Sequence, residues 1–273
     1  MPQQTVSWIT GASSGIGEAV AIEMASRGYL LILSARREDE LQRVKAICVS
    51  AGANSQNIYV LPLDVTDIES MPAKVTQANA AFGTLDLLFN NAGISQRATC
   101  LETDLATYRK IFEVDVFGQI ALTKLVLPLM IEQGSGHISV TASVAGKIGV
   151  SKRTGYCAAK HAVMGFFDSL RAELSPHNIH VSTVVPGFIR TNLSTNALKG
   201  DGSNFGVMDD DISAGMPVDR AAKVIVNGLE SKRMEINVGE GKEMLALTLK
   251  RLLPNLLFKV VAKRASDEQN EAN

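Results

Sequence analysis

The first 17 residues constrain the fold more than any other part of the chain. Residues 5–10 are rich in β-formers, and residues 11–17 read Gly-Ala-Ser-Ser-Gly-Ile-Gly ahead of a helical pattern that runs to Arg27. A strand, a glycine-rich turn and a helix in this order present backbone amides that bind phosphate. The spacing Gly-x-x-x-Gly-x-Gly lets a pyrophosphate approach closely. A plain turn of small residues is the alternative interpretation.

The end of the second expected strand indicates which dinucleotide is preferred. Residues 29–34 are a continuous apolar run, typical of a parallel strand buried on both faces. NAD-binding sites usually carry an acidic residue near the end of this strand, but here Arg36 and Arg37 follow. Arg36 is placed to bind a 2′-phosphate through charge-assisted hydrogen bonds. We therefore predict NADP(H) rather than NAD(H). The alternative is that both arginines stay solvated at the strand end.

Strand and helix patterns alternate through the remaining chain. Further strands are expected at 57–63, 85–89, 137–141, 180–185 and 234–238, and helices at 38–51, 67–82, 101–133 and 217–231. This alternation predicts one doubly wound α/β domain, with a seven-stranded parallel sheet and helices on both faces. Ligands of such sheets bind beyond the carboxyl ends of the strands. The glycine turn, Arg36, Asp64, Asn91 and Ser143 all fall at those ends.

Composition restricts the partners and the compartment. The 273 residues are 46% hydrophobic, and the formal net charge of −1 provides no field that would attract nucleic acid. Cys48, Cys100 and Cys157 are far apart and in no metal-binding spacing, which predicts free thiols in a reducing compartment. We expect no signal peptide ahead of the first strand and no transmembrane run, and therefore a cytoplasmic protein.

Tyr156 and Lys160 are the candidate catalytic pair. Residues four apart on a helix are neighbours, so the spacing holds an ammonium group near a phenol and favours the tyrosinate. A free phenol titrates near about 10 and needs such help to act at neutral pH. Tyr156 is then a general acid or base that Lys160 tunes. Such pairs also occur on solvated helix faces, so the interpretation depends on the surrounding motifs.

With these motifs in view, the chain resembles the short-chain dehydrogenase/reductase family over residues 5–238. The matching motifs are residues 10–17, residues 90–93, Ser143 thirteen positions before Tyr156, the Tyr156/Lys160 pair, and Pro186-Gly187. Residues 191–194 and 201–209 are similar to the member-seven branch of the human dehydrogenase/reductase set. The resemblance implies a Rossmann-type fold and hydride transfer between a nicotinamide and a carbonyl or alcohol.

The resemblance also implies residue roles. Tyr156 would protonate the carbonyl oxygen during reduction, Ser143 would hold that oxygen, and Lys160 would also bind the nicotinamide ribose. Asp64 would meet the adenine, and Ile189 with Thr191 would hold the carboxamide. The full set of expected cofactor-binding residues is Gly11, Ser13, Ser14, Gly15, Ile16, Gly17, Arg36, Arg37, Asp64, Val65, Asn91, Ala92, Gly93, Tyr156, Lys160, Pro186, Gly187, Ile189 and Thr191.

Asp115 departs from the family pattern. The family usually has Asn-x-x-Gly here, and its asparagine helps to hold a water that relays protons to the lysine; this chain reads Asp-Val-Phe-Gly at 115–118. An ionised Asp115 would attract the Lys160 ammonium and offset part of its field at Tyr156. Two interpretations stay open. The relay survives through the backbone carbonyl in a slower or differently pH-tuned enzyme, or catalysis is lost and cofactor binding remains.

The last third of the chain is expected to serve the substrate. Residues 190–216 form a long irregular stretch within the 1–240 domain, and the resemblance implies that it covers the substrate. Residues 241–264 mix apolar and basic side chains into a helical extension that Pro254 should split. This extension packs on another subunit, roofs the pocket or lies in a membrane interface. Residues 265–273 are a polar tail expected to be disordered.

The leading hypothesis is an NADPH-dependent reductase of a hydrophobic ketone or aldehyde, which also oxidises the corresponding alcohol. The resemblance suggests a homodimer or homotetramer. A non-catalytic NADP(H)-binding sensor or scaffold is the second hypothesis, and Asp115 is its support. The third is a peripheral membrane protein, attached through 241–264, whose enzyme fold serves mainly as an anchor.

Overall fold

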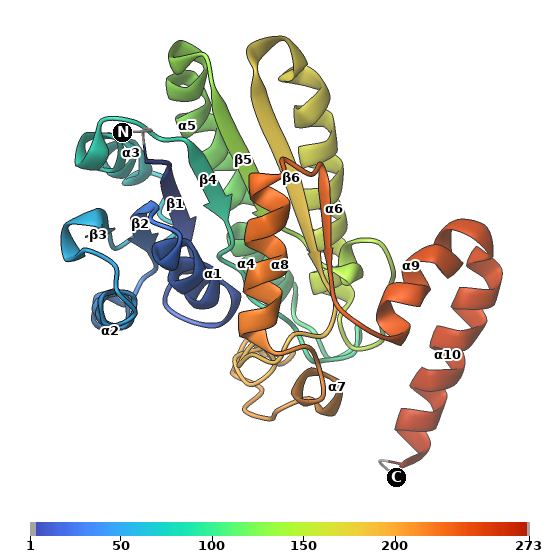
Figure 1. Cartoon of the computed structure of the whole chain (residues 1–273). Coiled ribbons are helices and arrows are strands. Elements are labelled where there is room, and N and C mark those ends of the chain that lie inside the picture. Colours follow the sequence, from blue (N-terminus) through green and yellow to red (C-terminus); the bar gives the residue numbers. More distant parts are fainter. Residues whose placement is uncertain (1–3, 272–273) are drawn as a thin grey trace.

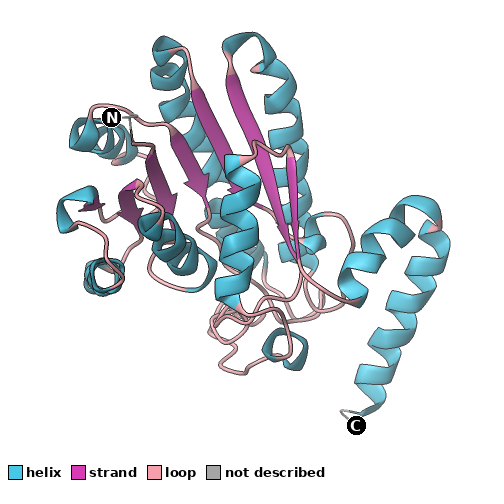
Figure 2. Cartoon of the chain, viewed as in Figure 1, coloured by secondary structure: helices cyan, strands magenta, loops and turns pink. Residues whose placement is uncertain are grey.

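The computed structural model describes residues 4–271, which form a seven-stranded parallel sheet between two layers of helices (Figures 1 and 2). The strand order is β3-β2-β1-β4-β5-β6-β7. Strands β2 and β3 therefore lie on one side of β1, and β4 to β7 lie on the other side. The predicted doubly wound α/β class is confirmed. The strands are β1 Val6–Thr10, β2 Leu30–Ser34, β3 Ile58–Val60, β4 Leu87–Asn90, β5 Gly136–Thr141, β6 Ile179–Pro186 and β7 Glu235–Val238.

The helices divide between the two faces of the sheet (Figure 1). Helices α1, α2 and α8 cover one face, and α3, α4, α5 and α6 cover the other. Their bounds are α1 Gly15–Ser26, α2 Glu38–Ser50, α3 Met71–Phe82, α4 Leu105–Phe112, α5 Gly118–Gln133, α6 Thr154–Glu173, α7 Asp210–Ser213, α8 Val218–Glu230, α9 Lys242–Leu252 and α10 Pro254–Glu271.

The apolar runs of the central strands follow from this sandwich. In β2, Leu31 and Leu33 belong to the core beneath α1, α2 and α8, whereas Ile32 belongs to the core on the opposite face. Successive strand residues point to opposite faces, so a strand covered on both sides needs apolar residues at every position. The parallel register pairs Ile32 with Trp8 of β1 and with Tyr59 of β3.

The helix expected over 101–133 is interrupted. It consists of α4, a π-helical segment at Glu113–Phe117 and α5. The stretch Leu105–Gln133 is apolar and long enough to cross a membrane by length and composition, but here it packs on the sheet as a core helix. In the π segment the backbone hydrogen bonds span five residues instead of four. This segment carries Asp115, which is fully buried. Such segments are often found at functional sites.

The C-terminal region differs in part from expectation. α9 ends at Leu252, and Pro254 starts α10 after the single non-helical residue Leu253, so the predicted split is confirmed. The expected disorder of the polar tail is wrong for residues 265–271, which are helical; residues 272–273 lie outside the described chain. Extending a helix that already exists costs far less than nucleating one. The stretch 190–216 is mostly turns, as expected, but contains the short helix α7.

Two helical glycines provide a matched stability test. A Cβ on Gly118 would lie 2.3 Å from the Val65 carbonyl oxygen, whereas a Cβ on the exposed Gly165 meets no atom within 4 Å. We expect Gly118→Ala to destabilise the protein by about 1–3 kcal/mol through backbone displacement. Gly165→Ala should stabilise it by roughly 0.5–1 kcal/mol, because alanine loses less backbone entropy in a helix. Urea unfolding measures both; a Gly118→Ala protein as stable as the parent would contradict the close packing.

Candidate functional site

A cavity of about 1390 Å³ opens at the carboxyl ends of the strands. All the predicted cofactor and catalytic residues line it except Gly17, which lies beneath its wall. Its volume is large enough for a dinucleotide and a substrate together, since single-ligand pockets usually measure about 300–1,000 Å³. The structure therefore brings the motifs, which are spread over the sequence from 11 to 191, into one site.

The glycine turn is crowded, which explains its residue types. Gly11 has φ +65°, and a Cβ on it would lie 2.9 Å from the Cα of Ala92. A Cβ on Gly17 would lie 2.3 Å from the Gly11 carbonyl oxygen, so a side chain would separate α1 from β1. Ser14, at the N-cap of α1, makes no side-chain hydrogen bond to the first turn. The first-turn amides therefore remain available for an anion such as a pyrophosphate, and this cradle fits a dinucleotide.

The adenosine end of the cavity lies at β2 and β3. Arg36 and Arg37 are exposed at its edge, and in the described part of the chain neither forms an ion pair. Asp64 follows β3, where one of its carboxylate oxygens accepts the amide and hydroxyl of Thr66 at 2.9 and 2.8 Å. Two guanidinium groups without a carboxylate partner give this end an excess of positive charge. A guanidinium group binds anionic groups through charge-assisted hydrogen bonds.

Asn91 fixes the centre of the site. Its side-chain amide donates to the carbonyl oxygen of Thr10 at 3.2 Å, and its side-chain oxygen accepts from the Thr141 hydroxyl at 3.0 Å. Its backbone amide donates to the Thr10 hydroxyl at 3.0 Å. Asn91 thus joins the ends of β1, β4 and β5. Hydrogen bonds to the ends of neighbouring strands therefore fix the position of Asn91 in the cavity.

Ser143 and Tyr156 both line the cavity. Ser143 follows β5, where its hydroxyl accepts the Ala145 amide at 3.1 Å and lies 3.4 Å from the Pro186 carbonyl oxygen. Tyr156 sits in the first turn of α6 and is 6% exposed. The Gln96 side chain holds this turn by accepting the Gly155 amide at 2.7 Å. Both hydroxyl-bearing residues therefore reach the cavity from well-fixed backbone.

Lys160 and Asp115 form a buried ion pair. Lys160 Nζ lies 3.2 Å from Asp115 Oδ2, donates to the Thr141 carbonyl at 2.9 Å and lies 5.7 Å from the centre of the Tyr156 ring. Asp115 Oδ1 accepts the Ile94 amide at 2.8 Å. Burial acts to lower the pKa of Lys160, but Asp115 and Tyr156 together raise it above its ordinary value. Burial also raises the pKa of the Asp115 carboxyl, an effect that the Lys160 ammonium and the Ile94 amide oppose. The structure thus places Asp115 against the lysine, as an ionic neighbour and not a neutral amide.

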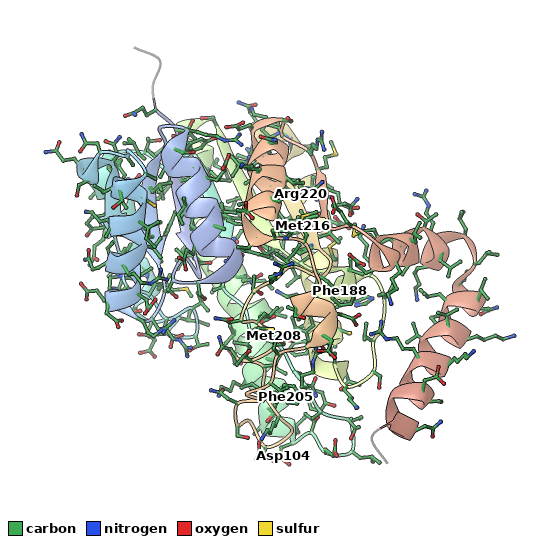
Figure 3. The ribbon with its side chains drawn as sticks, turned by 60° about the horizontal axis from the view of Figure 1, so that its bottom comes forward. Asp104, Phe188, Phe205, Met208, Met216 and Arg220 are labelled. Carbon is green, nitrogen blue, oxygen red and sulfur yellow. The ribbon has the colours of Figure 1, made fainter. Side chains whose placement is uncertain are left out.

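The substrate side of the cavity contains residues that the sequence did not single out. Arg97 and Arg153 both pair with Asp209, which belongs to the 190–216 stretch. Phe188, Phe205 and Met208 line the same side on loops at the carboxyl edge of the sheet (Figure 3). No motif or local pattern marks these arginines, because their shared partner is 112 and 56 residues away.

The C-terminal helices close one flank of the site. Glu243 of α9 and Leu257 and Val261 of α10 line the cavity, and Leu257 is buried. Glu243 packs against Gly187, where a Cβ would lie 2.7 Å from its side chain. The apolar pattern of 241–264 was the only sequence signal for this contact. Of the three expected packing modes, roofing of the pocket is the one that these contacts support.

Comparison with known proteins agrees with this geometry. Residues 5–202 match the family model for short chain dehydrogenases. The chain is 43% identical over 263 residues to the "Dehydrogenase/reductase SDR family protein 7-like" of Drosophila melanogaster, covering 96% of this chain and 81% of that protein.

Two solved structures have the same fold. One is a short chain dehydrogenase/reductase from Burkholderia phymatum in complex with NAD (TM-score 0.76, 27% identity, 86% of this chain and 89% of that one). The other is a metagenomic short-chain oxidoreductase in complex with NADP (TM-score 0.70, 28% identity, 86% and 96%). Fold, site and sequence agree: the chain belongs to the short-chain dehydrogenase/reductase family of oxidoreductases.

Proposed function

We propose that the protein is an NADPH-dependent oxidoreductase that reduces a hydrophobic ketone or aldehyde, or oxidises the corresponding alcohol. The observation that carries this proposal is the placement of Ser143, Tyr156 and Lys160 in one cavity with the glycine turn. We further propose that it works in the cytoplasm as a homodimer or homotetramer. The three free cysteines are consistent with a reducing compartment.

The protein's own groups perform the proton chemistry. The nicotinamide, when bound, supplies or accepts the hydride. Ser143 donates a hydrogen bond to the carbonyl oxygen, and Tyr156 transfers its proton to that oxygen as negative charge develops there. Lys160 lies 5.7 Å from the Tyr156 ring centre, and its positive charge stabilises the phenolate left behind. Asp115 holds Lys160 in place and weakens its field at Tyr156.

The preference for NADP(H) rests on Arg36 and Arg37. The two solved relatives were crystallised with NAD in one case and NADP in the other, so the family alone does not choose. In this chain both arginines line the cavity beyond β2. A guanidinium group binds phosphate through two parallel hydrogen bonds, which a ribose hydroxyl does not reproduce.

The walls of the substrate side favour an apolar compound. Phe188, Phe205, Met208, Leu257 and Val261 line this side, and Leu257 and Val261 come from the C-terminal helix. Apolar walls with a few converging polar groups are typical of small-molecule sites. The charge of Arg97 and Arg153 is shared with Asp209, so these guanidinium groups hold the covering loop as well as border the pocket.

A catalytically weak NADP(H)-binding sensor is the second candidate function. Asp115 favours it, because the carboxylate stands where the family usually has asparagine and contacts Lys160 directly. The intact Ser143, Tyr156 and Lys160 favour the enzyme. NADPH oxidation by the purified protein over a panel of hydrophobic ketones and aldehydes separates the two candidates.

Tyr156→Phe should lower the turnover number by about 10²–10⁴-fold, because the general acid is lost. NADPH affinity, measured by fluorescence titration, should change little. Tyr59→Phe, at a partly exposed tyrosine on β3 that does not line the cavity, is the matched control and should keep full activity. Equal turnover in the parent and Tyr156→Phe would show that Tyr156 is not the proton donor.

Arg36→Ser should raise the dissociation constant for NADPH by roughly 10–100-fold, since a charge-assisted phosphate contact contributes about 1.5–3 kcal/mol. The constant for NADH should stay within about twofold, because NADH lacks the 2′-phosphate. Titration of both cofactors into the parent and the variant measures the ratio. A parallel loss of affinity for both cofactors would argue that Arg36 acts on the fold and not on the phosphate.

Asp115→Asn should increase the reduction rate near neutral pH and move the alkaline loss of activity to lower pH. The Asp115 carboxylate raises the pKa of Lys160, so its removal lets Lys160 lose its proton at lower pH. The unopposed ammonium also makes Tyr156 a readier proton donor. The pH profile of turnover measures this. Asp168→Asn, at an exposed carboxylate on α6, the helix that carries Lys160, is the control, and an unchanged profile in Asp115→Asn would contradict the assignment.

A further inference from the structure

Helices α9 and α10 form a hairpin that stands away from the rest of the domain (Figures 1 and 3). We call residues 242–271 the C-terminal hairpin. Its inner side is accounted for by the site, because Ala246, Leu257 and Val261 line the cavity and Leu257 is 3% exposed. Its outer side has no such explanation within the fold.

The outer side is apolar and open to solvent. Among the described residues, 6 of the 17 exposed large apolar side chains belong to this hairpin, which is about a ninth of the chain. Val260 also lines the cavity, and we call the other five the outer apolar surface: Leu245, Leu252, Leu253, Leu256 and Phe258. Leu245 and Leu252 are 71% and 68% exposed and lie seven residues apart, on one face of α9. Grouped exposed apolar residues mark an interaction surface.

Basic residues border this surface. Residues 242–264 contain six Lys and Arg and one acidic residue, a net charge of +5 in a chain whose total is −1. Lys259 and Lys263 are exposed one turn apart on α10, beside Val260. Lys250 Nζ lies 4.4 Å from the centre of the Phe258 ring, which joins a charge to the apolar surface. Segment 242–264 is therefore basic, whereas Asp267, Glu268 and Glu271 in the last turns reduce the net charge of the whole hairpin to +2.

The charge distinguishes between two occupants of the outer apolar surface. In a symmetric dimer the same patch meets its own copy, which would bring together two copies of the basic segment 242–264, each of net charge +5. An anionic bilayer satisfies both features, since apolar side chains enter the acyl boundary while lysine and arginine contact the lipid phosphates and carboxylates. Charge complementarity thus favours lipid over a second copy.

We propose that the C-terminal hairpin docks on an anionic lipid surface through the outer apolar surface and its bordering basic residues. The hairpin lies in the interface without crossing the bilayer, because α10 contains charged residues along its length and α9 has only 11 residues. This docking does not depend on the proposed reaction, so binding and activity are tested separately.

Co-sedimentation of the full chain with sucrose-loaded vesicles tests the proposal. Vesicles of phosphatidylcholine with about 30% phosphatidylserine should carry the protein into the pellet at low salt, and the pelleted fraction should fall as sodium chloride is raised. Vesicles of phosphatidylcholine alone should bind at least about tenfold less. Equal binding to both vesicle types, or no binding to either, would overturn the proposal.

Substitutions assign the binding to the hairpin. Leu252→Asp with Leu256→Asp, and separately Lys259→Glu with Lys263→Glu, should each weaken partitioning by about tenfold or more. Met234→Asp, at a side chain as exposed as Leu252 but outside the hairpin, is the apolar control. Lys124→Glu with Lys223→Glu, at exposed lysines on α5 and α8, is the charge control. Both controls should bind like the parent.

Folding and self-association are measured on the same proteins. All the substituted side chains are exposed, so thermal unfolding and NADPH binding should match the parent in every variant. Analytical ultracentrifugation reports the oligomeric state. If Leu252→Asp with Leu256→Asp bound vesicles like the parent, the hairpin would not be the docking surface. If it dissociated an oligomer while the parent failed to bind vesicles, a second copy would cover the surface, and the proposal would be wrong.

Discussion

A buried ammonium group organises the polar edge of the sheet. Lys160 is 3% exposed, and a charge so far from water is costly unless it is paired and hydrogen-bonded. Asp115 and the Thr141 carbonyl supply these partners. Thr141 in turn donates to Asn91, which bonds to Thr10. One continuous polar network therefore ties β1, β4, β5, the π segment and α6 together. The glycine turn follows Thr10 at one end of this network, and Tyr156 lies beside Lys160 at the other end.

The two halves of the cavity are built differently. The cofactor half rests on strand ends and on the first turn of α1, where backbone contacts as close as those of Gly11 and Gly17 leave little room for change. The substrate half consists of loops and of the C-terminal helices. Asp209, paired with Arg97 and Arg153, joins the 190–216 stretch to the rest. Loops tolerate sequence change better than packed strand ends do, so the second half of the cavity is the one more open to change.

The C-terminal hairpin belongs to both the site and the surface. Leu257 closes the cavity from inside, and Leu256 and Phe258 on either side of it face solvent. A helix that is apolar on more than one face needs more than one apolar partner. The domain provides the first partner, and the proposed lipid surface provides the second. A lipid surface that contacts the outer face of α10 would then be separated from the cavity only by this helix, whose Leu257 forms part of the cavity wall.

The sequence by itself determined the sheet class, the glycine turn, the Tyr156–Lys160 spacing and the split at Pro254, because each depends on local periodicity or on one backbone position. Tertiary structure decided the rest. It broke the expected 101–133 helix with a π segment that turns Asp115 onto Lys160, extended α10 through the polar tail, and joined Arg97 and Arg153 to Asp209. These features depend on contacts between distant residues, which no local pattern encodes.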